Sequence, residues 1–138
     1  WPGGGAAALF PVAVAGFNSM RALSRFNEDP QKASRPFDAD RDGFVMAEGA
    51  AVLVLESQES AEARGATILA ELRGYGATSD AHHLTEPGPT GQSAANAIQL
   101  ALNAAGVVPS ESNYLNAHGT STPLNDRSET RAVKLALG

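Results

Sequence analysis

The segment that most limits the possible folds is a continuous apolar run at residues 50–55, AAVLVL. A strand with one face in water alternates apolar and polar residues, whereas this run has no polar position. It therefore predicts a central strand that is covered on both faces. Strands of this kind belong to sheets with helices packed on either side.

The clearest helical pattern lies in residues 92–105, where apolar residues recur at the i, i+3, i+4, i+7 spacing of an amphipathic helix. These apolar residues are Ala94, Ala97, Ile98, Ala101, Leu102 and Ala105. Gly106 follows directly and predicts the end of the helix. A last helix is expected from Asp126 to Leu137, because Asp126 and Glu129 have capping-box spacing.

Shorter patterns fill the rest of the chain. Helices are expected at 18–25 and at 60–64, the second ended by Gly65, and strands at 67–75 and 114–117. Residues 10–15 are either a short strand or the lead into the first helix. Strands and helices alternate, which predicts the α/β class.

Composition excludes several kinds of protein. The 138 residues carry ten basic and fifteen acidic side chains, a formal net charge of -5, which argues against a nucleic-acid-binding protein. No apolar run approaches the roughly 18 residues that predict a membrane span. The chain has no cysteine, so it holds neither a disulfide nor a cysteine nucleophile. A cytoplasmic location is expected.

Both ends of the sequence predict that the chain is an internal piece of a longer protein. The chain begins at Trp1, without an initiator methionine, and runs into a Gly/Ala stretch. It stops at Gly138, directly after an apolar helical pattern, where a capping glycine would lead into a further element.

The segment richest in chemical groups is NAHGTSTP at residues 116–123. His118 follows a predicted strand, and a neutral imidazole can donate a hydrogen bond to a developing oxyanion. Gly119 allows the backbone to approach a ligand closely, and Thr120, Ser121 and Thr122 offer hydroxyl donors and acceptors. From these residues alone, a turn that satisfies its own backbone is an equally good interpretation.

NAHGTSTP resembles the first histidine motif of the β-ketoacyl synthases, which include the polyketide ketosynthases. Residues 16–24, 35–56 and 74–85 resemble the same family, so the likeness extends from about residue 11 to 138. Residues 1–8 depart from the family pattern. The resemblance implies a thiolase-like fold, with residues 1–64 at the end of its first half and residues 65–138 at the start of its second.

The family resemblance also implies a reaction, the decarboxylating Claisen condensation of fatty-acid synthesis. A cysteine carries an acyl thioester, malonyl-acyl carrier protein loses CO₂, and the resulting enolate attacks the thioester. His118 corresponds to one of two histidines that stabilise the enolate. The cysteine is expected before Trp1, and the second histidine and a lysine after Gly138, so the chain alone is expected to be inactive.

Further residues take roles from the resemblance. Thr120 and Thr122 are expected to bind the substrate's phosphopantetheine arm, and Thr85, at a gating-loop position, is expected to bind substrate. Asn116, Asp126 and Glu129 are expected to support the site; for the two acids, a helix cap with favourable helix-dipole charge is about as good an interpretation.

The loop from Thr78 to Pro87 is expected to be a movable lid. Asp80 and His83 fall on the family's gating-loop positions, and Arg21 on the arginine that the loop contacts. Gly74 and Gly76 precede the loop and are expected to act as its hinge.

No metal site and no separate cofactor is expected. Asp38, Asp40 and Asp42 resemble the start of a calcium loop, but Gly49 stands where such a loop needs a bidentate Glu. The expected partners are an acyl carrier protein, whose phosphopantetheine arm is part of the substrate, and a second copy of the full-length chain. Alternatives are a ketosynthase domain of a polyketide synthase and a non-catalytic subunit resembling a chain-length factor.

Overall fold

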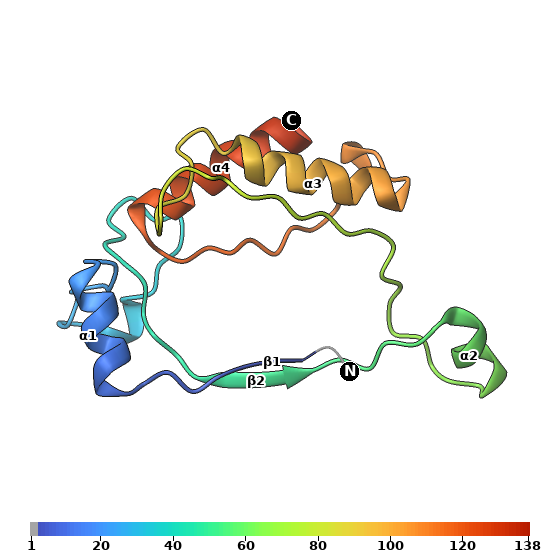
Figure 1. The fold of residues 1–138 in the computed structure, drawn as a ribbon, viewed down its shortest axis with the longest axis horizontal. Coiled ribbons are helices and arrows are strands. Elements are labelled where there is room, and N and C mark those ends of the chain that lie inside the picture. The colour runs from blue at the N-terminus through green and yellow to red at the C-terminus, as the bar shows by residue number, and fades with distance from the viewer. Residues whose placement is uncertain (1–2) are drawn as a thin grey trace. The chain divides into compact units, whose positions relative to one another are not determined.

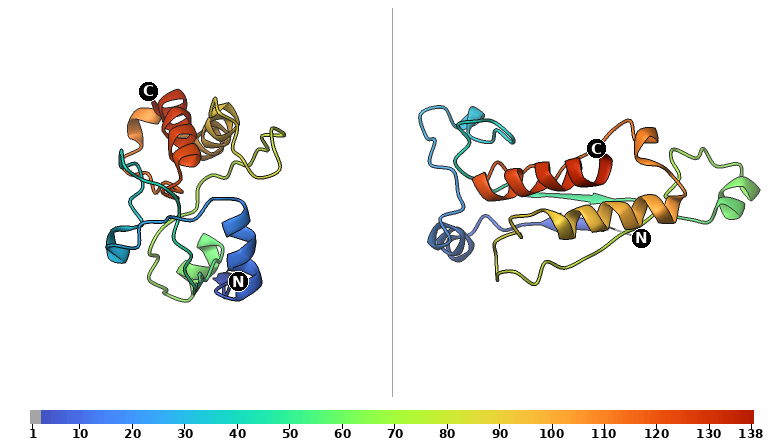
Figure 2. Two further views of the ribbon diagram at one scale, coloured as in Figure 1. Left: turned by 90° about the vertical axis from the view of Figure 1, so that its left-hand side faces the viewer. Right: turned by 90° about the horizontal axis from the view of Figure 1, so that it is seen from above.

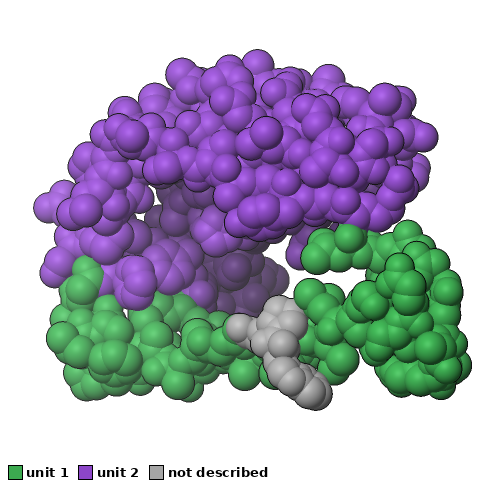
Figure 3. All heavy atoms as spheres, turned by 45° about the vertical axis from the view of Figure 1, so that its right-hand side comes forward, with its two compact units in different colours: residues 1–16, 46–72 green, residues 17–45, 73–138 purple. Residues whose placement is uncertain are grey.

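The computed structural model describes residues 3–138; Trp1 and Pro2, the first two residues of the segment expected to depart from the family pattern, lie outside them. Two compact units are formed, one from residues 1–16 and 46–72, the other from residues 17–45 and 73–138 (Figure 3). The elements are β1 (Gly3–Ala6), α1 (Pro11–Ser19), η1 (Pro30–Lys32), β2 (Gly49–Val52), α2 (Gln58–Ala63), α3 (Gln92–Ala105), η2 (Pro109–Glu111) and α4 (Pro123–Leu137) (Figure 1).

The first unit contains the predicted strand at residues 50–55, but as a shorter strand with little cover. β2 pairs antiparallel with β1, in a register that sets Gly3 opposite Val52 and Ala6 opposite Gly49. The expectation of a strand covered on both faces is wrong for this structure, because Val52 and Leu53 are each 66% exposed. A strand needs neighbours to satisfy its backbone and cover its faces, and among residues 3–138 only β1 pairs with β2.

The first helix begins earlier than expected. α1 covers Pro11–Ser19, so residues 10–15 mostly belong to the helix itself. Pro11 suits the first helical position, because its missing N–H would have no partner there. The expected continuation to residue 25 is blocked at Arg21, whose φ of 54° is left-handed. In the second unit, Leu23 and Phe44 form a parallel bridge instead.

The second unit is built around the pair of helices α3 and α4, which lie side by side (Figure 2). Their contact is made by Ala95, Ala132 and Ala136, with Ile98 and Leu137 packed against them. Ala95 is completely buried, although the predicted apolar face of the helix did not include it. Small side chains allow the two helices to approach closely, and this gives the unit a small alanine core.

Helix ends follow local sequence closely at α2 and α3. Ser57 caps α2 by accepting a hydrogen bond from the Ser60 N–H, and Gly65 has the left-handed φ of 67° expected after this helix. The predicted bounds of α3 are confirmed, including the left-handed Gly106 at its end. The predicted start of α4 is wrong: Thr122 is the N-cap, and Pro123 occupies the first turn ahead of Asp126.

The strands predicted at 67–75 and 114–117 are absent from the described chain. Residues 73–76 instead pass against α3, where the Arg73 guanidinium donates to the Ala105 carbonyl at 2.9 Å. A Cβ at Gly74 or at Gly76 would lie 2.1 Å from a carbonyl oxygen of α3. These two glycines therefore permit close packing against the helix, which is a different physical reason for them than a hinge.

No helix among residues 3–138 combines the length and apolar character needed to cross a membrane.

Candidate functional site

The backbone at His118 is held by a carboxylate on the next helix. One oxygen of Glu129 accepts from the His118 N–H at 2.6 Å, and the other accepts from the Gly119 N–H at 2.8 Å. Hydrogen bonds to an ionised acceptor are stronger than neutral ones. Because both oxygens are used, Glu129 fixes where the His118 backbone lies, while the imidazole itself remains exposed.

Two hydroxyls stand next to this histidine. The Oγ1 atoms of Thr120 and Thr122 are 2.9 Å apart. Thr122 Oγ1 also accepts from the Asn125 N–H at 3.1 Å, because Thr122 is the N-cap of α4. The structure therefore brings together the residues expected to bind the pantetheine arm at positions 120 and 122, at the start of a helix that also carries Glu129.

Ser121 and Gly119 have other roles than those expected. The Ser121 side chain is completely buried, and its Oγ accepts from the Arg35 N–H at 3.0 Å, so this hydroxyl is not offered to a ligand. Gly119 has a φ of 51°, and a Cβ there would lie 3.3 Å from both Pro36 and Phe37. The missing side chain at 119 thus makes room for residues 36–37 of the same chain.

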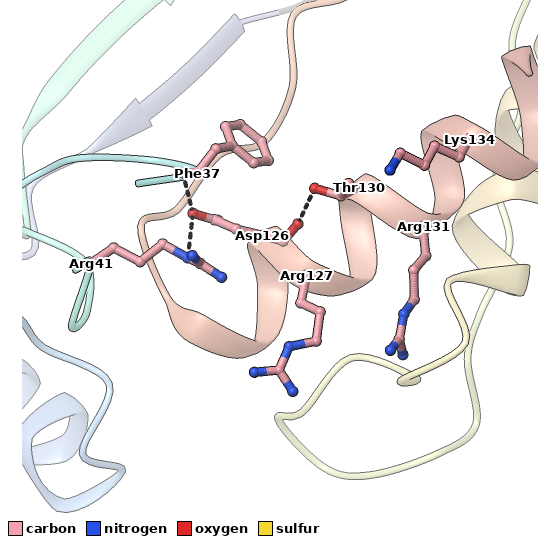
Figure 4. Close-up of a pocket in the computed structure, with 7 residues that line it drawn as sticks. All are labelled: Phe37, Arg41, Asp126, Arg127, Thr130, Arg131 and Lys134. Atoms are coloured by element: carbon pink, nitrogen blue, oxygen red, sulfur yellow. Dashed lines mark hydrogen bonds and ion pairs between the residues drawn. The ribbon is translucent and has the colours of Figure 1, made fainter. Parts of the chain in front are cut away.

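Asp126 is a buried acid with three partners. It accepts from the Phe37 N–H at 2.8 Å and from Asn125 Nδ2 at 3.2 Å, and it forms an ion pair with Arg41 Nε at 3.1 Å (Figure 4). Its side chain is 1% exposed, and that of Arg41 is 15% exposed. The interpretation of Asp126 as a helix cap is wrong, because its carboxylate bonds to residues 37 and 41 rather than to free N–H groups of α4.

Two arginines order residues 35–42, Arg41 by bonds to the start of α4 and Arg35 by bonds within the segment, and the sequence offered no sign of their role. The Arg41 guanidinium donates to the carbonyls of Asp38, Thr122 and Pro123. Arg35 donates to the Asp40 carbonyl at 2.7 Å and lies over the Phe26 ring, 4.4 Å from its centroid. Residues 35–42 were assigned to the family by resemblance, which did not predict the roles of Arg35 and Arg41. An arginine that donates to backbone carbonyls needs no partner side chain at a fixed spacing, so no sequence pattern reveals it.

An open pocket of about 340 Å³ lies along α4 beside this ion pair. Its lining consists of Phe37, Arg41, Asp126, Arg127, Thr130, Arg131 and Lys134 (Figure 4). Two of its four cations are already engaged, since Arg41 pairs with Asp126 and Arg131 donates to the Pro89 carbonyl. His118 does not line it, so the pocket and the histidine loop are separate features of the second unit.

The expected lid residues are engaged mainly with their own loop. Asp80 Oδ2 accepts from the Gly88 N–H at 2.6 Å. His83 Nδ1 accepts from the backbone N–H groups of Thr85 and Glu86, both at 3.2 Å. Among residues 3–138, no ion pair joins Arg21 to Asp80. The direct pairing of Arg21 with Asp80 is therefore not formed in this structure.

Asn116 and Thr85 are the remaining residues of the predicted site. Asn116 is exposed, and the described residues give its side chain no hydrogen bond. Thr85 donates a hydrogen bond to His83 Nδ1 of the same loop through its backbone N–H.

Within residues 3–138, no group of three His, Cys, Asp or Glu side chains is arranged to hold a metal ion.

The acid at position 42 belongs to a separate turn that steadies the same segment. Hydrogen bonds from the Ser24 hydroxyl and the Arg25 N–H, at 2.6 and 2.7 Å, hold the pKa of Asp42 below its ordinary value, and the nearby Arg35 guanidinium acts in the same direction. Asp42 is thus tied to its own chain and is not a free carboxylate for calcium.

Family comparison assigns the chain to a class of enzymes. The model of the beta-ketoacyl synthase N-terminal domain matches residues 2–61, and that of the C-terminal domain matches residues 69–138. The chain belongs to the β-ketoacyl synthase family.

Particular relatives narrow this class. The chain is 58% identical over 136 residues to 3-oxoacyl-[acyl-carrier-protein] synthase 2 of Synechocystis sp., and 53% identical over 136 residues to the protein of the same name from Staphylococcus aureus. Each alignment covers 99% of this chain but only 33% and 34% of the relative. The chain thus spans about a third of the length of the curated relatives it matches.

Solved structures give the same assignment for the fold. A beta-ketoacyl synthase from Burkholderia phymatum superposes with a TM-score of 0.92 at 47% identity, over 99% of this chain and 33% of that one. A polyketide ketosynthase solved with its acyl-carrier protein superposes with a TM-score of 0.93 at 45% identity, over 97% and 33%. The chain is therefore a mixed α/β piece with the fold of the corresponding third of the ketosynthases.

Proposed function

We propose that the protein to which this chain belongs joins an acyl thioester to malonyl-acyl carrier protein by decarboxylating Claisen condensation, in fatty-acid synthesis. The observation that carries the proposal is the geometry of the His118 loop. Glu129 holds the backbone of His118 and Gly119, and the paired hydroxyls of Thr120 and Thr122 stand immediately beyond. A histidine whose backbone is held in place, close in sequence to two paired hydroxyls, suits a thioester whose oxygen gains charge in the transition state.

The steps place definite demands on this chain and on the rest of the protein. The bond from the malonyl carbon to CO₂ breaks, its electron pair forms the enolate, and the imidazole Nε2–H of His118 stabilises the enolate oxygen. The enolate then attacks the acyl thioester, and the cysteine sulfur leaves as thiolate. This chain contains no cysteine, so the nucleophile belongs to the remaining two thirds, as do the second histidine and the lysine.

The two-part organisation, divided after residue 64, belongs to the same proposal. Its support is that separate family models, for the N-terminal and the C-terminal domain, match residues 2–61 and 69–138. Residues 1–64 then end the first thiolase-like half, and residues 65–138 begin the second.

The experiment is His118→Ala in the full-length enzyme. Loss of one oxyanion donor typically lowers the rate by about 10²–10³-fold, so decarboxylation should fall by that factor. Transfer of the first acyl group to the cysteine should persist, since it does not need the enolate. Single-turnover assays with labelled acyl and malonyl donors separate the two steps. Normal CO₂ release by the variant would refute the proposal.

The carrier protein and the dimer are part of the same proposal. A structural relative at 45% identity was solved as a ketosynthase with its acyl-carrier protein, which supports a carrier protein as partner here. Thr120 and Thr122 are proposed to hold its phosphopantetheine arm and Thr85 to bind substrate, with Asn116 and Asp126 as supporting residues. A homodimer in the cytoplasm is proposed for the full-length chain, on family resemblance.

The lid is proposed in an altered form. The loop that contains Asp80, His83 and Thr85 is held by hydrogen bonds in which the Asp80 and His83 side chains accept from backbone N–H groups. The contact between Arg21 and this loop belongs to another state of the enzyme. Asp80→Ala removes the bond to Gly88 and should slow condensation more than loading of the first acyl group, because the loop then no longer closes over the second substrate. Equal slowing of both steps would remove the lid from the proposal.

A polyketide role is the second candidate. The observation in its favour is the TM-score of 0.93 to a polyketide ketosynthase. The 3-oxoacyl synthases are closer in sequence, at 58% and 53% against 45%, which favours fatty-acid synthesis. A non-catalytic subunit, the remaining alternative, would lack the cysteine in the full-length chain, so the upstream sequence tests it directly.

A further inference from the structure

Ser121 adopts a backbone conformation that its residue type disfavours. Its φ of 67° is left-handed, where a Cβ crowds the backbone and glycine is the usual occupant. Two positions earlier, at a φ of 51°, this chain does use glycine. Left-handed non-glycine residues persist where their surroundings over-determine them, and they gather at functional sites. The serine side chain must therefore contribute something that glycine at the same position would lose.

That contribution is a buried hydrogen bond to a distant segment. Ser121 is 0% exposed, and its Oγ accepts from the Arg35 N–H at 3.0 Å, across 86 residues of sequence. Arg35 is itself fixed, because its guanidinium donates twice to the Asp40 carbonyl and lies over the Phe26 ring. Ser121 is thus hydrogen-bonded to a segment that is itself held by the contacts of the Arg35 side chain.

The hydrogen bond between Ser121 and Arg35 affects the positions of the two residues that flank Ser121. Thr120 and Thr122 flank Ser121, and the turn at 121 brings their Oγ1 atoms to 2.9 Å. Thr122 is also held by the N–H of Asn125 at the start of α4. Among residues 3–138, the other bond of Thr120 Oγ1 is a long one from the Thr122 N–H at 3.4 Å. The position of the Thr120 hydroxyl therefore depends on the backbone at 121.

We propose that Ser121 is a positioning residue, whose buried hydroxyl, bonded to the Arg35 N–H, holds Thr120 and Thr122 in the arrangement that binds the substrate's pantetheine arm. This inference rests on the function proposed above and adds to it a residue that does not itself touch the substrate. The arm is bound equally in the ground and transition states, so loss of positioning should raise KM and leave kcat nearly unchanged.

The test compares Ser121→Ala and Ser121→Gly in the full-length enzyme. Both variants remove the acceptor for the Arg35 N–H; glycine also relieves the left-handed strain, so it keeps the test valid if the alanine variant folds poorly. For each variant we expect KM for malonyl-acyl carrier protein to rise about 3- to 10-fold, the effect of losing one hydrogen bond between the threonine pair and the arm, with kcat within about 2-fold of wild type.

The matched control is Ser128→Ala. Ser128 is 7% exposed and its Oγ donates to the Gly88 carbonyl at 2.7 Å, so the variant also loses a buried serine hydrogen bond, away from the threonine pair. It should be destabilised with KM unchanged. An unchanged KM in Ser121→Gly, or an equal rise in Ser128→Ala, would overturn the inference. A wild-type enzyme without condensation activity would instead refute the proposed function.

Discussion

The helix pair α3–α4 and the apolar segments of the first unit differ sharply in burial, although α4 carries many polar residues and residues 50–55 carry none. Ala95 and Ala132 are 0% and 1% exposed, whereas Leu69 and Leu72, in the segment expected to be a strand, are 94% and 78% exposed. A helix satisfies its backbone internally, so two helices can form a core by themselves. A strand must find its hydrogen bonds on neighbouring strands, and residues 67–72 have none.

A contrast in burial also separates two ion pairs, one taken from each unit. Arg41 and Asp126 are largely buried and join segments 85 positions apart, whereas Arg64 and Glu56 are 60% and 27% exposed and lie eight positions apart. A buried pair is costly to break because the remaining charge is left without a partner in a poorly solvated site. An exposed pair contributes little, because water solvates either partner alone.

The largest expected effect follows from this contrast. In the full-length enzyme, Asp126→Ala should lower the free energy of unfolding by about 3–5 kcal/mol, since Arg41 is left buried and unpaired. Glu56→Ala is the matched control in the other unit and should change stability little. Denaturant unfolding of both variants measures the difference. Equal losses would mean that burial in this structure does not distinguish the two pairs.

A smaller effect concerns the isolated 138-residue chain. Amide hydrogens of α3 and α4 should exchange more slowly than those of residues 67–72, because only the helices have internal bonds and a core. The exposed leucines and valines of the first unit should make the chain aggregate or bind hydrophobic dyes. Hydrogen exchange followed by mass spectrometry, with dye binding, measures both. A sharp cooperative thermal transition of a soluble monomer would contradict the prediction.

The smallest effect is a dependence on pH in the turn at Asp42. Its pKa is lowered in the folded state, so the stabilisation it provides is fully present above the ordinary value of 3.8 and is lost as the pH falls through the folded-state pKa. NMR titration of the Asp42 carboxyl in the full-length enzyme should give a midpoint below 3.8. Asp42→Asn should remove this part of the acid dependence of stability. A midpoint at or above 3.8 would contradict the hydrogen bonds to Ser24 and Arg25.

Local sequence predicted those structural features whose physical cause lies within a few residues along the chain. The bounds of α3 followed from its apolar spacing and from Gly106, and Gly65 took the left-handed conformation expected after α2. The mixed α/β class and the family both followed from residues along the chain, although the strands predicted at 67–75 and 114–117 are absent from the described chain. The start of α4 was wrong because Asp126 and Thr122 both suit a cap, and the choice between them depends on which side chain is drawn away by a partner elsewhere.

Tertiary structure decided the contacts that hold the site together. Asp126 bonds to Phe37 and Arg41, Ser121 bonds to Arg35, and each contact joins residues more than 80 positions apart. Two of these contacts use the backbone N–H group of Arg35 or Phe37, which every residue except proline carries, so no pattern of side chains predicts them. The sequence by itself predicted His118, Thr120 and Thr122 as residues of the proposed site. Their mutual geometry depends on a distant segment, because only a folded chain brings residues 35–41 against the start of α4.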